Sequence, residues 1–199
     1  GENITYEVFD IYRLDGVMVQ KEIESKYLFI NNVKNITTVT KCAQSVKEKG
    51  IIDDYFIVDD YADEALKYYH IDIDSFLGGY YYSIAELVSI YLCDTDYLVH
   101  FSGDSRIEKK YRTSFIKKGI DILENNKQIA VVNPVWSYKY FSAKRESDEV
   151  KKDYYVGYGF SDQCYLIRTE EFKRQIYNEK NICSERYPKY GGELFEKSS

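Results

Sequence analysis

Short apolar runs alternate along this chain with segments of helical periodicity, and each run stops at small polar or acidic residues. The four runs are Tyr27–Ile30, Tyr55–Val58, Tyr97–Phe101 and Ile129–Val132. Runs of this length, bounded by turn formers, favour strands that are buried on both faces. The order β-α-β-α-β-α-β implies an α/β fold: a single-domain, Rossmann-like mixed and mostly parallel sheet with helices on both faces.

Start and stop signals predict where the intervening helices lie. Thr37 or Thr38 is the expected N-cap of the first helix, and Gly50 is its expected stop. Ser83 and Glu86 have the spacing of a capping box and are expected to open the helix before the third run. A further helix is expected over about Thr113–Glu124, and the stretch from Asp60 to Phe76 shows no clear pattern.

The two ends of the chain differ from this alternating core. Ile4–Arg13 and Gly16–Ile23 favour strand around Asp15-Gly16, which predicts a β-hairpin. Residues 1–25 are therefore an expected hairpin extension and residues 26–199 the main domain. Later segments predict a mobile charged loop, a strand and a helix, in the order Ser142–Asp153, Gln163–Arg168 and Thr169–Tyr177.

Charge and cysteine content exclude several classes of function. The net charge of −6 and the pI near 5.1 provide no basic field for nucleic acid. The four cysteines form no C-x-x-C pair, so zinc-site and redox-motif spacings do not occur. No apolar stretch approaches the ~18 residues of a membrane span, and no signal-peptide pattern is present. We expect a cytoplasmic protein with reduced thiols and no membrane-spanning segment in this chain.

Acidic residues stand where a ligand site of an α/β sheet is expected. Asp59-Asp60 and Asp104 each follow a predicted strand, and Glu193 lies in the Gly-rich tail. Ligands of open α/β sheets bind at the carboxyl ends of the strands. One such site suits a base or ribose, and the other suits a Mg²⁺ or Mn²⁺ ion that bridges a diphosphate. The alternative for each residue is an acidic turn former without a function.

The order of these pieces resembles the nucleotide-sugar glycosyltransferases of the A-type fold, close to the large inverting family 2. The resemblance covers most of Lys26–Lys197, and no single motif in it is specific. Its pieces are Tyr27–Asn32, Tyr55–Asp60, Gly78-Gly79, Ser102-Gly103-Asp104, Gly159–Gln163 and Tyr190–Glu193.

The resemblance implies roles for the residues at the strand ends. Asp59 or Asp60 would bind the base of the nucleotide, with Asn32 beside it. Asp104 would match the last carboxylate of the Asp-x-Asp motif of the family, which binds the metal and the diphosphate. Ser102 stands where that motif has its first Asp, so this chain departs from the family there.

The resemblance also implies a catalytic carboxylate near the end of the chain. Glu193 would correspond to the acidic residue near the catalytic base, although Leu194 replaces the second acid of the usual Glu-Asp pair. Asp162 is a candidate for orienting hydroxyl groups, with a strand-edge turn as its alternative. Trp136 and Tyr138 are candidates for a sugar-stacking wall, with core packing as theirs. His100 is expected to be a core or supporting histidine rather than a metal ligand.

The function implied is transfer of a sugar from a nucleotide-sugar donor, a UDP-sugar favoured, to a hydroxyl of a carbohydrate, lipid or protein. The reaction would invert the anomeric centre with help from Mn²⁺ or Mg²⁺. A non-catalytic carbohydrate- or nucleotide-binding domain of the same fold is one alternative. A sugar nucleotidyltransferase is another, but its usual Gly-rich loop after the first strand has no counterpart, since Tyr27–Thr40 contains no glycine.

Overall fold

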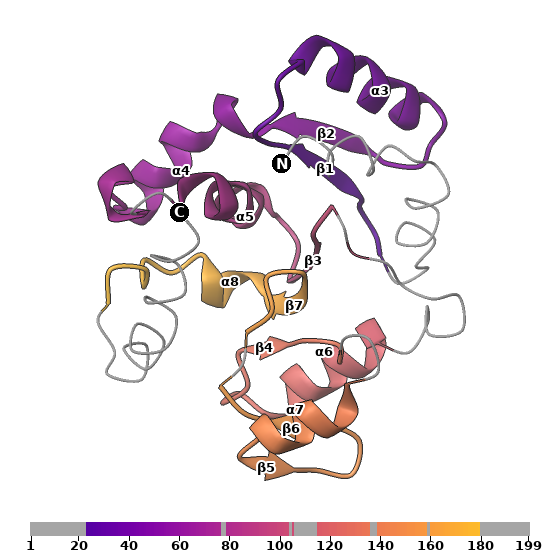
Figure 1. The fold of residues 1–199 in the computed structure, drawn as a ribbon, viewed down its shortest axis with the longest axis vertical. Coiled ribbons are helices and arrows are strands. Elements are labelled where there is room, and N and C mark those ends of the chain that lie inside the picture. The colour runs from indigo at the N-terminus through magenta and orange to yellow at the C-terminus, as the bar shows by residue number, and fades with distance from the viewer. Residues whose placement is uncertain are drawn as a thin grey trace.

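The computed structural model describes residues 23–76, 79–103, 105, 115–135, 139–158 and 160–179 (Figure 1). The predicted hairpin therefore falls almost wholly outside the described residues. Several residues singled out from the sequence also lie outside them: Gly78, Asp104, Trp136, Tyr138, Gly159 and Glu193. Among the residues that are described, no helix is long and apolar enough to cross a membrane.

The first part of the chain is a parallel β-α-β unit, as the sequence predicts. Strand β1 (Tyr27–Ile30) pairs in parallel with β2 (Asp54–Ile57), and α3 (Ile36–Glu48) connects them. The N-cap of α3 is Asn35 rather than a threonine, because its side-chain oxygen accepts a hydrogen bond from the Thr38 backbone N–H at 3.0 Å. After α3, Gly50 takes the left-handed conformation, with φ +67°, that a glycine adopts easily.

Two helices and two short 3₁₀ turns lie between β2 and the next strand. They are η1 (Val58–Asp60), α4 (Ala62–Tyr69), η2 (Ile73–Phe76) and α5 (Tyr80–Leu92). Helix α4 was not predicted, although its buried residues recur at i, i+3, i+4 and i+7: Ala62, Ala65, Leu66 and Tyr69.

The capping box that was expected to open α5 is wrong. This helix begins one turn earlier, at Tyr80 with Gly79 as its N-cap, so Ser83 and Glu86 lie inside it. The Tyr80 ring packs edge-on against Phe76 with ring centroids 5.6 Å apart. Tertiary packing of this kind stabilises a first turn for which the local sequence has no capping signal.

The strands of the second sheet are antiparallel neighbours. Strand β7 (Cys164–Arg168) lies between β3 (Tyr97–Phe101) and β4 (Val131–Val132) and pairs antiparallel with both. Helix α6 (Phe115–Asn125) joins β3 to β4, close to its predicted bounds. Since β3 and β4 both oppose β7, they point the same way, as a β-α-β crossover requires.

A single, mostly parallel Rossmann-like sheet is therefore not what the described residues form. The fold is mixed α/β, but its hydrogen-bonded strands make short sheets in which one pairing is parallel and the rest are antiparallel. The expectation failed because β7 comes from late in the chain and enters between two strands that are close in sequence. Strand order along the chain contains no information about that insertion.

The segment after β4 also differs from the prediction. In place of a mobile loop over Ser142–Asp153, the chain forms α7 (Tyr140–Glu146) and a small hairpin of β5 (Glu149–Val150) with β6 (Tyr155–Val156). Helix α8 covers only Thr169–Phe172, which is shorter than the helix expected there.

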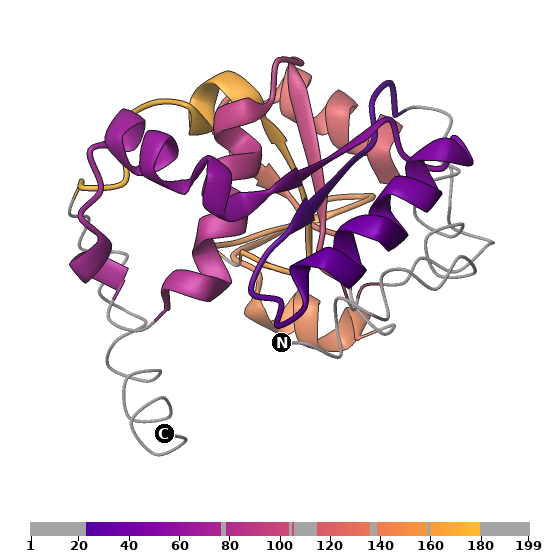
Figure 2. The same cartoon turned by 90° about the horizontal axis from the view of Figure 1, so that it is seen from above.

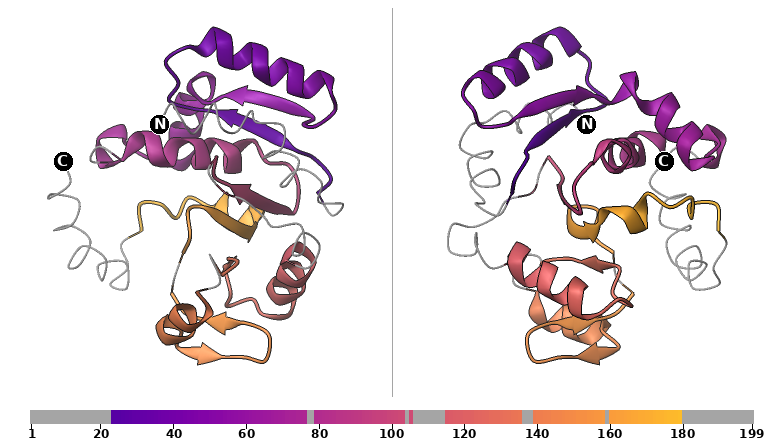
Figure 3. Two further views of the ribbon diagram at one scale, coloured as in Figure 1. Left: turned by 45° about the vertical axis from the view of Figure 1, so that its right-hand side comes forward. Right: turned by 180° about the vertical axis from the view of Figure 1, so that it is seen from behind.

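Spatially, the strands follow one another as β2, β1, β3, β7 and β4 in Figures 1 and 3. Figure 2 shows α3 and α6 on one side of these strands and α4 and α5 on the other. Buried clusters match this layering: Val39 and Ala43 of α3 pack with Ile30, while Val88 of α5 packs with Val58. The expectation of helices on both faces is confirmed.

The carboxyl end of β7 is held by a buried charged residue. Arg168 is only 8% exposed, and its guanidinium donates to both carboxylate oxygens of Glu171 at 2.7 and 2.9 Å. The same group donates to the carbonyls of Leu123 and Ile129 at 2.7 Å each. Every arm of the buried cation therefore has a partner, and α8 is tied to the connection between α6 and β4.

Candidate functional site

The carboxyl ends of β1 and β2 lie at one edge of the fold, because the two strands are parallel and in register to their last pair, Ile30 with Ile57. Asn32 follows β1 in the left-handed conformation, with φ +52°, and is exposed. Asp59 and Asp60 follow β2 in η1, and both are exposed. The structure thus brings together the three residues that were predicted to lie at the base of the nucleotide, while their role stays a prediction.

Helix α5 begins at this same edge. The Asn31 amide donates to the backbone carbonyl of Tyr81 at 2.7 Å, which joins the end of β1 to the first turn of α5. The amide oxygen of Asn31 is buried and has no hydrogen-bond partner among the described residues. Burial raises the pKa of the Tyr80 phenol, and the neighbouring charges of Asp59 and Asp63 raise it further.

The end of β3 is a turn built from serine hydroxyls. The Ser102 and Ser105 hydroxyls lie 2.8 Å apart, and the Ser105 hydroxyl donates to the Gln163 carbonyl at 2.7 Å. The backbone N–H of Ser102 donates to that same carbonyl at 2.8 Å. Ser102 therefore has a structural role in the turn. Asp162, directly before Gln163, is exposed beside it.

Helix α5 also connects the first edge to the end of β3. Glu86, in the second turn of α5, lies with its Oε1 atom 3.9 Å from Nε2 of His100 in β3. Since Tyr81 of the same helix contacts Asn31, the carboxyl ends of β1, β2 and β3 face one edge. The predicted donor residues and Asp162 therefore lie along a common border.

Glu86 is the residue of this border that sequence reasoning did not single out as functional. Its side chain is 23% exposed. Burial raises the pKa of the Glu86 carboxyl to about 7, and the nearby charge of Asp162 adds to the effect. A carboxyl with a pKa near neutrality can both accept and release a proton at physiological pH.

His100 is neutral under the same conditions. Burial lowers its pKa to about 4, although its contacts with the Asp162 backbone and charge act in the opposite direction. Its ring stacks on Tyr165 with centroids 4.8 Å apart and planes 14° apart. A neutral imidazole 3.9 Å from Glu86 forms no ion pair at neutral pH. His100 is a half-buried residue packed against Tyr165, and its supporting role stays a prediction.

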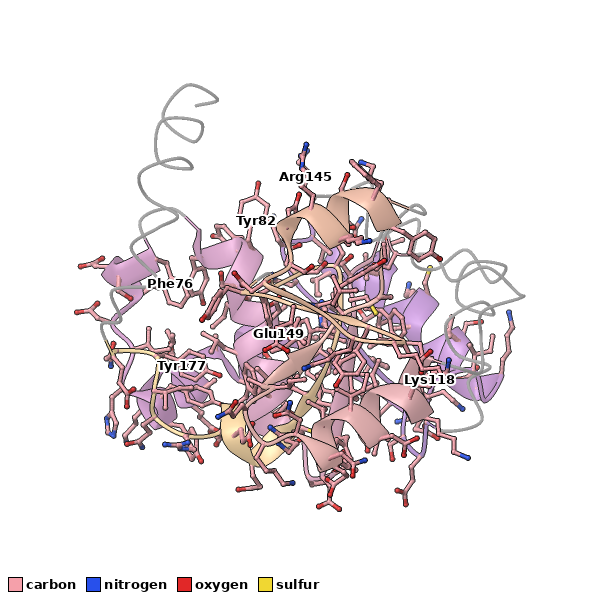
Figure 4. All side chains as sticks on the ribbon, turned by 90° about the horizontal axis from the view of Figure 1, so that it is seen from below. Phe76, Tyr82, Lys118, Arg145, Glu149 and Tyr177 are labelled. Atoms are coloured by element: carbon pink, nitrogen blue, oxygen red, sulfur yellow. The ribbon has the colours of Figure 1, made fainter. Side chains whose placement is uncertain are left out.

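A cavity of about 330 Å³ adjoins Glu86. It lies between η2, α5, β7 and α8, and Ser75, Ser83 and Glu86 are polar residues of its wall. Figure 4 shows two of its lining residues, Phe76 and Tyr177, on the same side of the molecule. Its aromatic wall consists of Phe76, Phe160, Tyr165, Phe172 and Tyr177. This volume is near the lower end of the range for small-molecule sites.

The sequence contains one signal that could have identified Glu86 as a candidate site residue. Glu86 is the only charged residue in the thirteen residues of α5. A single carboxylate in an otherwise uncharged helix is a candidate for burial, and buried carboxylates concentrate at functional sites. The aromatic partners of the cavity come from segments far apart in the chain, so no local pattern identifies them.

The described residues contain no group of three or more His, Cys, Asp or Glu side chains placed to hold a metal ion. At the end of β3 they supply two serine hydroxyls that bond to each other rather than a set of carboxylates. A metal at this turn would therefore depend on Asp104. This residue and Glu193 lie outside the described part, so both assignments stay predictions.

Comparisons with known proteins add no family to this picture. No protein-family model, no curated protein and no solved structure matches the chain.

Proposed function

We propose that this chain is a glycosyltransferase that moves a sugar from a nucleotide-sugar donor to a hydroxyl acceptor, with inversion at the anomeric carbon. The observation that supports the proposal best is the convergence at one edge of Asn32, Asp59-Asp60 and the end of β3. Ligands of α/β folds bind at the carboxyl ends of strands, and exposed carboxylates there suit the hydroxyl and N–H groups of a nucleoside.

The chemistry needs a base and a stabilised leaving group. The acceptor oxygen attacks the anomeric carbon as the bond from that carbon to the diphosphate oxygen breaks, and a carboxylate takes the hydroxyl proton. Glu193 is the predicted base, and Asp162 is the predicted residue for orienting hydroxyl groups. Exposed Asp162 lies beside the β3 turn, where a sugar held by its diphosphate would be within reach.

A divalent cation, if it binds, neutralises the departing diphosphate. Asp104 is the predicted ligand. Since Ser102 is bonded to Ser105 within the turn, a second carboxylate is not contributed at the position where the family has one. We therefore expect weak affinity for the metal before the donor diphosphate binds and adds its own oxygen ligands.

The test is a thermal-shift series with UDP, GDP, CDP, ADP and their sugar conjugates, each with and without Mn²⁺. A ligand that binds only the folded state raises Tm by mass action. A hundredfold excess over Kd should add about 5–10 °C for a chain of this size. We expect one nucleotide to give a clear shift, and Asp59→Asn and Asp60→Asn to reduce it.

Asp121→Asn is the matched control, because Asp121 is an exposed aspartate on α6. It should leave the shift unchanged. If no nucleotide or nucleotide sugar shifts Tm under either condition, the proposal is wrong. A shift that Asp59→Asn, Asp60→Asn and Asp121→Asn all leave intact would place the nucleotide elsewhere.

A nucleotide-binding domain without transfer activity is the second candidate. The serine turn at the end of β3 favours it, because Ser102, bonded to Ser105, stands where the resembled motif has its first metal-binding carboxylate. Nucleotide binding without any consumption of the bound nucleotide sugar, across acceptors and with Mn²⁺ present, would select this candidate over the enzyme.

A further inference from the structure

The cavity beside Glu86 has a wall suited to a compact apolar molecule. Five aromatic side chains and Ile71, Leu87 and Ile90 line about 330 Å³. None of the described lining residues is a lysine, arginine or histidine, so the described part of the wall provides no counter-charge for an anion. An anionic ligand would also face the Glu86 carboxylate and, beyond it, Asp162.

Besides the Ser83 hydroxyl, two polar groups of the described wall remain for a ligand. The Ser75 hydroxyl already donates to the Asp72 carbonyl, and the Tyr177 hydroxyl donates to the Phe172 carbonyl. The Tyr165 hydroxyl is different, because it has no hydrogen-bond partner among the described residues. It is also buried, in a residue that is only 1% exposed. The carboxyl of Glu86 is near enough to act electrostatically on this phenol.

A neutral hydroxyl group matches the hydrogen-bonding capacity of both groups. It can donate its proton to the Glu86 carboxylate and accept a hydrogen bond from the Tyr165 O–H. An unpartnered buried hydroxyl costs free energy that a ligand of this kind recovers. The charge and polarity of the cavity thus favour an alcohol or phenol over an acid.

The cavity also lies close to the edge that carries the predicted donor residues. Glu86 is five residues after Tyr81, whose carbonyl contacts Asn31. At 1.5 Å per residue, the helix separates these two positions by about 7.5 Å along its axis. The cavity and the carboxyl ends of β1 and β2 are therefore both adjacent to the first two turns of α5.

We propose that this cavity binds the acceptor, that the acceptor is an alcohol or phenol with a compact apolar or aromatic body, and that Glu86, in place of the predicted base Glu193, receives its hydroxyl proton. The acceptor oxygen forms the new bond to the anomeric carbon, and the bond to the diphosphate breaks with its electron pair leaving on the diphosphate. This inference rests on the proposed glycosyl transfer. A carboxyl whose pKa lies near 7 is well suited to take that proton.

The binding test uses ligand-observed NMR with benzyl alcohol and benzoate at pH 8. Benzyl alcohol should bind in the millimolar range, and benzoate, of similar size but anionic, should bind at least tenfold more weakly. Ser83→Phe adds a ring at a cavity-lining position and should abolish binding of benzyl alcohol. Tyr82→Phe is the control, because Tyr82 is 84% exposed on the same helix (Figure 4).

Glu86→Gln tests the charge of the cavity without changing its shape. It should let benzoate bind about as well as benzyl alcohol, since the repelling carboxylate is gone. The inference is overturned if benzyl alcohol fails to bind, if Ser83→Phe leaves its binding intact, or if benzoate binds the unsubstituted protein equally well.

The transfer step has its own readout. With the nucleotide sugar that gives the thermal shift as donor and benzyl alcohol as acceptor, Glu86→Gln should lower kcat at least 100-fold. The nucleotide-induced shift of Tm should stay unchanged, because Glu86 does not belong to the predicted nucleotide site. An unchanged kcat would remove Glu86 from the reaction.

The two proposals fail in different ways. If nucleotides bind and benzyl alcohol does not, only the acceptor cavity is wrong. If benzyl alcohol binds and no nucleotide does, the proposed function is wrong, and the acceptor role of the cavity is overturned with it.

Discussion

At the scale of single residues, Glu86 and His100 show how burial can shift two neighbouring groups in opposite directions. Burial disfavours the charged form of each, so the pKa of the acid rises to about 7 and that of the base falls to about 4. Both groups are therefore neutral in the folded protein between about pH 4.5 and 6.5. In the unfolded chain, both would be charged over much of that range.

Their contributions to stability should have opposite slopes with pH. A raised carboxyl pKa means that the folded state binds the proton more tightly, so Glu86 should lower the free energy of unfolding by about 3 kcal/mol as pH rises from 4.5 to 7. A lowered histidine pKa means that the folded state binds the proton less tightly. His100 should therefore raise the free energy of unfolding by about 3 kcal/mol as pH rises from 4 to 6.5.

Urea denaturation across this pH range tests the pair. Relative to the unsubstituted protein, Glu86→Gln should gain stability as pH rises towards 7, and His100→Gln should gain stability as pH falls towards 4. Asp121→Asn, on exposed α6 surface, should follow the unsubstituted protein. Parallel profiles for all proteins would show that neither group titrates as the structure implies.

At the scale of elements, α3 is a helix that local chemistry largely defines. Its apolar residues Val39, Ala43 and Val46 face β1 and β2, and Asn35 and Gly50 mark its two ends. The N-cap lies two residues before Thr37 and three residues before Thr38, the two N-caps expected from the sequence. Asparagine and threonine are both good N-caps, so residue type alone does not identify the N-cap of α3. The N-cap is the residue whose backbone leaves the helical conformation, and here that residue is Asn35.

Replacing the observed cap should destabilise the protein measurably. Asn35→Ala removes the oxygen that accepts from the Thr38 N–H and should lower the free energy of unfolding by about 1 kcal/mol. Thr37→Ala, at an exposed position within the helix, should change it by less than about 0.5 kcal/mol. Urea melts of the two variants distinguish them, and a larger loss for Thr37→Ala would assign the cap to the threonine.

At the scale of the whole molecule, β7 is the strand on which the second sheet depends. All five of its residues are buried, and it pairs with β3 on one side and β4 on the other. Helix α6 approaches it so closely that a Cβ atom on Gly119 would lie 2.5 Å from a Leu166 methyl carbon. The strand therefore joins segments that are distant in sequence.

Leu166→Ala should accordingly be among the costly substitutions in this fold. Leu166 is fully buried, and the cavity left by its truncation should lower the free energy of unfolding by about 2–5 kcal/mol. Leu98→Ala, at a half-buried position in neighbouring β3, should cost less. Chemical denaturation of both variants tests this order, and equal losses would show that β7 is not the central strand.

Local sequence signals specify several elements of this fold. Apolar runs bounded by turn formers located β1, β2, β3 and β7 to within a few residues, and helical spacing located α3 and α6. Placement of Asn32 and Asp59-Asp60 at one edge also followed from sequence, because parallel strands bring their carboxyl ends together.

Strand pairing and the loss of water by side chains depend on contacts between distant segments of the chain. The position of β7 between β3 and β4 depends on backbone hydrogen bonds between segments far apart in the chain. The raised pKa of Glu86 requires His100, Asp162 and Tyr165 to be folded around α5. Pairing and desolvation are properties of distant contacts, and a local sequence pattern does not specify them.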